Sequence, residues 1–245
     1  MDAIISLKNI NKSFKSRDHH LSVLADIDLA INNGEFFMFL GPSGSGKSTI
    51  LRIMSGLEKD FKGKVELAPS IGWRDMSFVF QEFALLPWLT VAENIEIGLL
   101  ARDINIAERH KIIKKELEIM GLEKFGHVYP RDLSGGMKQR TGIARALATN
   151  PRVIFMDEPF SELDSFTAEE LRKKLLTIWQ ERKMTIVMVS HIVEEAVQLA
   201  DRIAVLTPRP SKIEKVVTNN LSRPRQKRTP EFFNLEDELA RIIKP

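Results

Sequence analysis

The chain has 245 residues, of which 43% are hydrophobic, so it can bury a sizeable core and is not disordered as a whole. It contains no cysteine, which excludes disulfide frameworks, thiolate zinc sites and cysteine nucleophiles. The formal net charge of +3, from 36 Lys and Arg against 33 Asp and Glu, is too small to indicate nucleic acid as a partner.

Short apolar runs alternate with longer helical patterns along most of the chain. The predicted strands are residues 4–7, 36–40, 77–80, 153–156, 185–190 and 203–206. Several are apolar throughout, which is typical of strands covered on both faces in a parallel sheet. Helices are predicted at 48–56, at 107–120 before Gly121, after 133–136, and after a capping box formed by Thr167 and Glu170. Residues 82–148 are mostly helical, so the sequence predicts an α/β fold with a helical insertion.

The first chemical motif is a glycine-rich loop that matches the phosphate-binding pattern G-x-x-x-x-G-K-S/T. It follows the strand at 36–40 and opens a helix, so its backbone N–H groups and the helix N-terminus can hold an anion. Lys47 is expected to reach the β- and γ-phosphates of a nucleotide, and the Ser48 hydroxyl to hold Mg²⁺. A flexible turn with a surface lysine is the alternative, which the strand–loop–helix context disfavours. The loop consists of Gly41, Pro42, Ser43, Gly44, Ser45, Gly46, Lys47 and Ser48.

The predicted strand at 153–156 is followed by two adjacent carboxylates, Asp157 and Glu158. Two such acids are, taken alone, more often a solvated turn. With a phosphate loop upstream, the first is placed to hold Mg²⁺ and the second to orient or deprotonate the attacking water. The two motifs together resemble P-loop ATPases.

Residues 133–140, Leu-Ser-Gly-Gly-Met-Lys-Gln-Arg, resemble the signature motif of ABC ATPases. Physically, the segment is a second helix N-terminus with a Ser134 cap, and hence a second phosphate site; a plain helix cap is the alternative for Ser-Gly-Gly alone. The resemblance covers residues 3–230. It implies a P-loop NTPase (RecA-like) core, an inserted helical subdomain at about 82–149, a small antiparallel β subdomain, and a tail helix at 231–245.

The resemblance also implies a role for each site residue, with ATP and Mg²⁺ as ligands. Gln81 would touch Mg²⁺ and water and sense a membrane partner, Glu158 would activate water, and His191 would contact the γ-phosphate. Phe14 would stack on adenine, although an aromatic beside an edge strand is usually core. Two positions depart from the family pattern, Glu162 in the D-loop and Ile192 after the histidine. The nucleotide would be held by residues 41–49, ending at Thr49, and across a dimer by Ser134, Gly135, Gly136 and the D-loop Asp164; Mg²⁺ would be held by Ser48, Gln81 and Asp157.

The chain carries one half-set of these motifs, which implies a homodimer. Its apolar runs are far shorter than the roughly 20 residues that cross a bilayer, and its first residues do not resemble a signal peptide. We therefore expect a peripheral subunit on the cytoplasmic face of the inner membrane. It would energise an integral membrane permease and act indirectly with a periplasmic or surface solute-binding protein. The residues after Gln81, from 83 to 94, resemble the nitrate, sulfonate and taurine importer group, as do residues 129–130, 206–210, 223–225 and 231–233.

Several alternatives remain open at this point. Within residues 83–94, Trp88 could instead be ordinary core. A non-transport ABC ATPase acting on nucleic acid or ribosomes, an exporter subunit and a catalytically dead module are the rival functions. The solute is not specified; nitrate, sulfonate, taurine, bicarbonate-like and thiamine-precursor-like cargo all fit. Residues 208–230 hold seven Lys and Arg against one Glu, which suggests a solvated basic tail or, less simply, a contact with anionic lipid.

Overall fold

The computed structural model describes residues 2–16 and 19–243. The chain divides into two compact units, one formed by Met1–Trp73 with Lys183–Pro245 and the other by Arg74–Arg182. The helical insertion predicted at 82–149 lies within the second unit, which also holds two strands and a further helix. Within the described ranges, no helix combines the length and the apolarity that crossing a bilayer requires.

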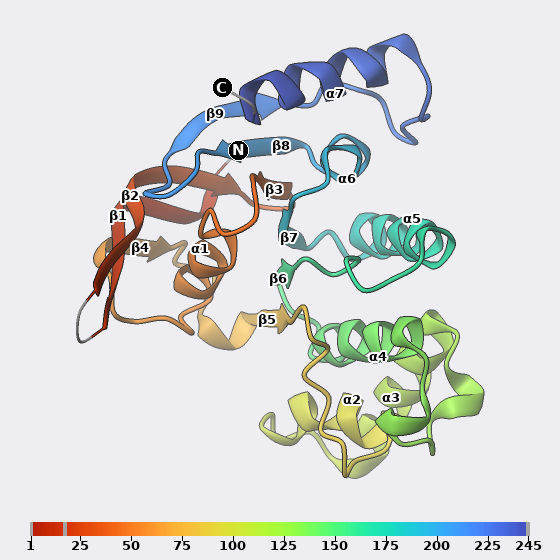
Figure 1. Cartoon of the computed structure of the whole chain (residues 1–245). Helices are drawn as coiled ribbons and strands as arrows, with labels where there is room; N and C mark the ends of the chain where they lie inside the picture. Colours follow the sequence, from red (N-terminus) through yellow and green to blue (C-terminus); the bar gives the residue numbers. More distant parts are fainter. Residues whose placement is uncertain (1, 17–18, 244–245) are drawn as a thin grey trace. The chain divides into compact units, whose positions relative to one another are not determined.

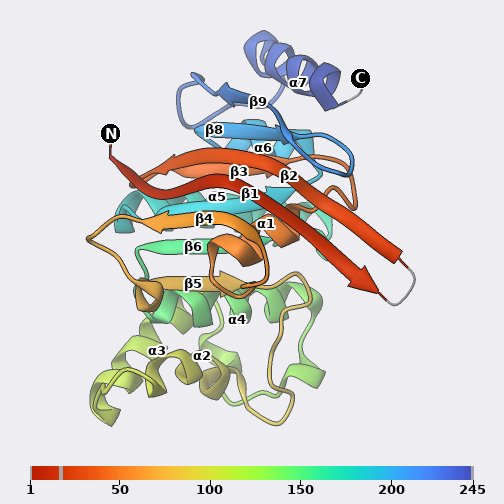
Figure 2. The same cartoon turned by 90° about the vertical axis from the view of Figure 1, so that its left-hand side faces the viewer.

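The first unit contains an antiparallel sheet of three strands in the order β2-β1-β4 (Figure 2). The strands are β1 (Ala3–Ser16), β2 (His19–Asn32) and β4 (Lys62–Leu67). The strand predicted at 4–7 is only the start of β1, and neither β2 nor β4 was predicted. Register shifts after Leu7 and Ile10, and positive φ angles at Asn9 and Asp26, break the alternation that would have indicated these strands.

The same unit contains three parallel strands with an antiparallel strand at their edge. Here β3 (Phe36–Leu40) lies between β7 (Thr185–Ser190) and β8 (Arg202–Leu206), and β9 (Ile213–Thr218) pairs with β8. Every residue of β3 and β7 is buried, which is why their sequences are apolar throughout. The carboxyl ends of β7, β3 and β8 therefore meet at one edge, the place where α/β sheets bind ligands.

Three helices accompany these strands in the first unit: α1 (Lys47–Met54), α6 (Val193–Leu199) and α7 (Pro230–Ile243) (Figure 1). The helix α1 packs on β7, and α7 packs on α6 and β8. The buried side of α7 is formed by Phe232 and Leu239.

The second unit places the parallel strands β5 (Met76–Val79) and β6 (Val153–Asp157) beside a group of helices. The helix α4 packs against α2, α3, α5 and β5, so it is the central helix of this unit. The predicted helix at 107–120 corresponds to α3, which ends as expected at Gly121 in a left-handed conformation (φ 67). The helices are α2 (Val91–Leu100), α3 (Ile106–Met120), α4 (Gly135–Ala148) and α5 (Ser165–Arg182), with short 3₁₀ turns at Trp73–Asp75, Glu123–Phe125 and Pro130–Asp132.

The capping box predicted at Thr167 and Glu170 is wrong. The helix α5 begins at Ser165, because the Asp164 carboxylate accepts hydrogen bonds from the N–H groups of Phe166 and Thr167, both at 3.0 Å. A capping box does occur at the start of α2, where Thr90 and Glu93 exchange side-chain and backbone hydrogen bonds.

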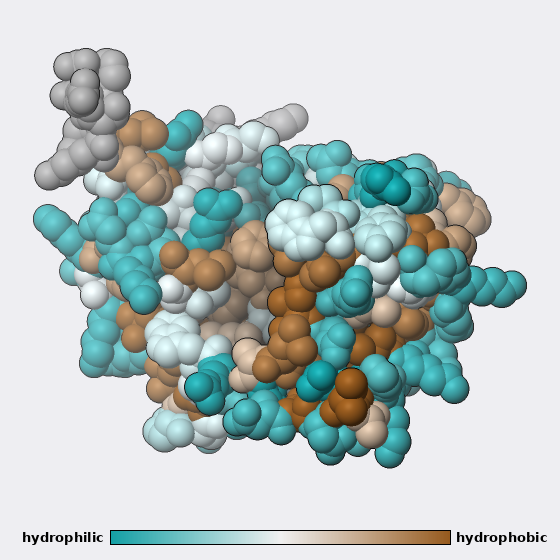
Figure 3. Space-filling view, turned by 90° about the horizontal axis from the view of Figure 1, so that it is seen from below, coloured by the Kyte–Doolittle hydropathy of each residue, from teal (hydrophilic) through white to brown (hydrophobic). Residues whose placement is uncertain are grey.

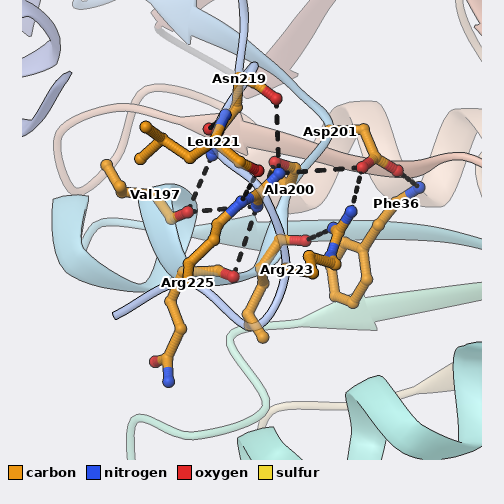
Figure 4. A network of polar contacts seen from close by, with 10 residues as sticks. Phe36, Val197, Ala200, Asp201, Asn219, Leu221, Arg223 and Arg225 are labelled. Carbon is orange, nitrogen blue, oxygen red and sulfur yellow. Dashed lines mark hydrogen bonds and ion pairs between the residues drawn. The ribbon is translucent and has the colours of Figure 1, made fainter. Parts of the chain in front are cut away.

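Two arginines of the basic C-terminal segment are not solvated, because Arg223 and Arg225 bind the end of α6 (Figure 4). The Arg225 side chain is 1% exposed and donates to the carbonyls of Ala200 (2.7 Å) and Val197 (3.2 Å). Arg223 donates to the Asp201 carboxylate. Burial lowers the pKa of Arg225 to about 10. These guanidinium groups satisfy carbonyls that the end of a helix leaves without partners.

Replacing Arg225 with alanine is expected to destabilise the protein by about 3 kcal/mol, since several buried carbonyls would lose their donor. The thermal midpoint should fall by roughly 6–12 °C for a chain of this length. Arg228→Ala is the matched control, because Arg228 is exposed in the same segment and should change the midpoint by less than about 1 °C. Equal effects of the two substitutions would contradict the structural role of Arg225.

Candidate active site

The phosphate loop follows β3 and leads into α1, and two of its glycines have left-handed backbones. Gly44 has φ 77 and Gly46 has φ 89. A Cβ atom on Gly46 would lie 2.7 Å from Cγ1 of Val23 and 2.9 Å from Cδ2 of Leu24, both on β2. Only glycine suits such a position, because any side chain would meet both backbone strain and steric overlap.

The interior of the loop fits an anion. Lys47 is buried, and its ammonium group donates to the carbonyls of Gly41 and Pro42, each at 3.0 Å. The Ser45 hydroxyl is buried and has no hydrogen-bond partner among the described residues. The N-terminus of α1, which attracts anions, begins at the end of this loop. A bound phosphate supplies acceptors for such groups, so the residues present suit a nucleotide.

His191 follows β7, whose last residue Ser190 pairs with Leu40 just before the phosphate loop. His191 is exposed, and hydrogen bonds of the neighbouring Ser190 hold the turn that carries it. The Ser190 hydroxyl lies 2.6 Å from a carboxylate oxygen of Glu195 and accepts a hydrogen bond from the N–H of Ile192 at 3.0 Å. Glu195 is 3% exposed. This support is not predictable from the sequence, because an acidic residue in the first turn of a helix is usually solvated.

Phe14 is 44% exposed, so the interpretation of this side chain as core is wrong. The Lys12 ammonium lies 4.6 Å from the centre of its ring. Phe14 lines a hollow together with Leu24, which also packs against Gly46 of the phosphate loop. An exposed aromatic face that lines this hollow suits the predicted adenine contact.

The second unit brings Gln81, Asp157 and Glu158 to one edge of its strands. Because β5 and β6 are parallel and Val79 pairs with Met156, the residues that follow these strands lie side by side. Asp157 is 3% exposed, and Glu158 has a left-handed φ of 43. Such strained backbones are concentrated at functional sites. The Glu158 carbonyl accepts from the N–H (3.2 Å) and hydroxyl (3.0 Å) of Ser161, which fixes the turn.

The signature segment begins α4 and lies against residues 161–164, which resemble the D-loop, because a Cβ atom on Gly135 would lie 3.5 Å from the Glu162 carbonyl oxygen. The Ser134 hydroxyl accepts a hydrogen bond from the N–H of Met137 at 3.3 Å, as a helix cap does. A Cβ atom on Gly136 would lie 2.8 Å from Cγ2 of Thr167. Hydrogen bonds from Thr167 lower the pKa of Asp164, whose carboxylate caps α5. The predicted site residues thus fall into two sets, with the phosphate loop, Phe14 and His191 in the first unit and the others in the second.

Comparisons with known proteins agree with this geometry. Residues 24–161 match the family model described as ABC transporter. An uncharacterized ABC transporter ATP-binding protein of Methanocaldococcus jannaschii is 41% identical over 250 residues, covering 100% of this chain and 92% of that protein. The chain belongs to the ABC transporter family. It is an ATP-binding subunit of that family, whose members hydrolyse ATP with Mg²⁺.

Two further ABC relatives carry importer names. The aliphatic sulfonates import ATP-binding protein of Bacillus thuringiensis is 39% identical, covering 96% of this chain and 94% of its own length. The nitrate import ATP-binding protein of Synechocystis is also 39% identical, covering 98% and 95%. A solved dimeric ATP-binding cassette with ADP and Pi has a TM-score of 0.79 and 35% identity, covering 89% of this chain and all of that one. The predicted family and fold class are confirmed.

Substituting Gly46 with alanine should disrupt ATP binding by this ABC subunit. The new methyl group would overlap Val23 and Leu24, so the loop would have to move or the protein would lose about 2–5 kcal/mol of stability. Gly121→Ala is the control, since its φ of 67 carries a similar strain but the nearest atom is 3.7 Å away. Titration calorimetry should show lost ATP affinity for Gly46→Ala alone; retained affinity in that variant would contradict the packing argument.

Proposed function

We propose that this chain is the ATP-hydrolysing subunit that energises an ABC importer for a small solute of the sulfonate or nitrate class. The observation that supports the ATPase part most strongly is the presence of a phosphate loop, an adjacent Asp157–Glu158 pair, a signature helix and His191 in one chain. The importer part is supported by the names of the sulfonate and nitrate relatives, which align with almost their whole length.

In this proposal two copies bind two ATP molecules between them. The loop of one copy holds the phosphates with its N–H groups and Lys47, and the signature segment of the second copy closes over the same ATP. Ser134 and the free N–H groups at the start of α4 suit that role, because a helix N-terminus attracts phosphate. Phe14 stacks on the adenine ring, and Asp164 lies in the D-loop at the contact between copies.

Hydrolysis is assigned to residues at the ends of three strands. Glu158 accepts a proton from the attacking water, and Gln81 orients that water. His191 stabilises negative charge that develops on the γ-phosphoryl group. Oxygens of Ser48, Asp157 and Gln81 would hold Mg²⁺, which would supply positive charge to neutralise the phosphates. Loss of the γ-phosphate would then remove the bridge between copies and allow the dimer to open.

The segment from residue 82 to 91 is the proposed contact with the permease. Trp88 is 68% exposed, so its alternative interpretation as core is wrong. The segment is nevertheless firmly held, because the fully buried Asn94 side chain donates to the carbonyls of Leu86 (3.1 Å) and Leu89 (3.0 Å). A rigid segment with an exposed tryptophan suits a protein interface. Figure 3 shows a band of hydrophobic residues bordered by hydrophilic ones on the face that it presents.

The proposed partners follow from this arrangement. The subunit would form a homodimer on the cytoplasmic face of the inner membrane, attached to integral membrane permease subunits. A periplasmic or surface solute-binding protein would deliver the solute without touching this chain. Nucleic acid is not among the proposed partners, because the net charge is only +3 and no observation favours a non-transport role.

Replacing Glu158 with glutamine should reduce the ATP turnover number by about 10²–10⁴-fold, the usual contribution of a general base. ATP affinity should stay within about twofold, since Gln keeps the size of the side chain and removes only its basicity. Turnover is measured by phosphate release and affinity by titration calorimetry. The control is Glu181→Gln, an exposed glutamate on α5. Turnover near that of wild type in Glu158→Gln would rule out the assigned base.

The importer proposal is tested by purifying the tagged full chain from detergent-solubilised membranes of its host. A multi-spanning membrane protein should co-purify in stoichiometric amount, and Trp88→Ala should release it while leaving ATP affinity unchanged. Phe233→Ala is the control, because Phe233 is 51% exposed on α7 outside the proposed contact. Recovery of only a soluble protein or nucleic acid would refute the transport role and leave the ATPase assignment intact.

A further inference from the structure

The turn that follows β8 lies directly against the phosphate loop. Residue Leu40 of β3 pairs with Val205 of β8, so the segments after these two strands leave the sheet at the same edge. A Cβ atom on Gly41 would lie 3.1 Å from both Cβ and the carbonyl oxygen of Leu206. The chain after β8, residues 207–212, is therefore placed beside the site of nucleotide binding.

This turn is held in one conformation by its own hydrogen bonds. The N–H of Thr207 donates to the carbonyl of Lys212 at 3.0 Å, and the N–H of Lys212 donates to the Thr207 hydroxyl at 2.9 Å. The Ser211 hydroxyl donates to the Thr207 carbonyl at 2.7 Å, and Ser211 is completely buried. The turn is thus a fixed support for the residues at its tip.

The turn is also anchored to the strand that packs on the phosphate loop. The N–H of Ser211 donates to the Val23 carbonyl at 2.8 Å, and the N–H of Ala25 donates to the Ser211 carbonyl at 3.0 Å. Val23 and Leu24 are the two residues whose side chains leave no room for a Cβ atom on Gly46. The turn is consequently bound to β2, which in turn packs against the phosphate loop.

Arg209 is at the exposed tip of this turn, with its guanidinium group over Gly44. A Cβ atom on Gly44 would lie 3.2 Å from Nη2, 3.7 Å from Cζ and 3.9 Å from Nε of Arg209. In the part of the chain that the structure describes, this guanidinium group forms no hydrogen bond or ion pair. Residues 206–210 resemble the corresponding segment of the nitrate, sulfonate and taurine importer group, but the proposed function gives them no role.

The phosphate loop on which Arg209 lies carries positive charge of its own. The Lys47 ammonium is part of the same loop, and the N-terminus of α1 carries a partial positive charge. The first turn of α1 contains no acidic residue that would compensate. A second cation fixed against this positive region is favourable only when an anion occupies it. A guanidinium group is also well suited to bind phosphate, because its planar donors can engage two oxygens at once.

We propose that Arg209 is a second phosphate-binding cation of the nucleotide site, which acts with Lys47 on the phosphates of ATP and ADP. The residue contributes to affinity rather than to the hydrolytic step. This inference does not depend on the importer role, since it concerns nucleotide binding by the chain itself.

The test is titration calorimetry of the full chain with ATP and ADP in the presence of Mg²⁺. Arg209→Ala and Arg209→Gln should each lower the affinity for both nucleotides about tenfold, which is the contribution of one charge-assisted contact. The affinity of Arg209→Lys should lie between those of these variants and wild type. Lys212→Ala is the matched control, because Lys212 is an exposed cation of the same turn. The Lys212→Ala variant should bind ATP and ADP with the affinity of wild type. Thermal unfolding without nucleotide should give the same midpoint for Arg209→Gln as for wild type.

Three results would overturn the proposal. Wild-type nucleotide affinity in Arg209→Gln would show that the guanidinium charge does not contribute to nucleotide binding. An equal loss in Lys212→Ala would show that only the general charge of the turn matters. Unchanged affinity together with weaker ATP-dependent dimerisation, measured in the Glu158→Gln background, would assign Arg209 to the contact with the second copy instead.

Discussion

The absence of space for a side chain at the left-handed Gly46 is the constraint on which the nucleotide site depends. Gly46 is enclosed by Val23 and Leu24, and Gly44 is covered by Arg209. The packing of Val23 and Leu24 against Gly46 holds the backbone N–H groups of the loop in a fixed arrangement, which lowers the cost of binding phosphate. The wholly buried strand β3 fixes where the loop begins. The conformation of the loop therefore depends on β2, on β3 and on the turn after β8, as well as on its own sequence.

The candidate site residues are divided between the two units of the chain. The first unit holds the loop and His191, while the second holds the Asp157–Glu158 pair and the signature helix. Each unit orients its own residues through short, local contacts, such as the Ser190–Glu195 hydrogen bond and the bonds from Ser161 to the Glu158 carbonyl. A nucleotide site that a second copy completes can respond to ATP by closing and opening.

The sequence predicted the elements whose burial is uniform. Residues 36–40 and 185–190 were predicted with the observed bounds, because strands covered on both faces are apolar throughout. The antiparallel strands were largely missed, because bulges near Asn9 and Asp26 interrupt their alternation. Motif spacing located the candidate site residues, but spacing carries no information on burial. The buried supports Glu195 and Arg225 and the exposure of Phe14 and Trp88 therefore required the structure.

In the proposed mechanism, one copy of the chain cannot hydrolyse ATP alone. The most direct measurement is the ATPase rate of the purified chain over a range of protein concentrations, with sedimentation velocity on the same samples. Activity per subunit is expected to rise with concentration where monomers predominate and to level off once dimers form. A constant activity per subunit at concentrations where only monomers are observed would contradict the shared site.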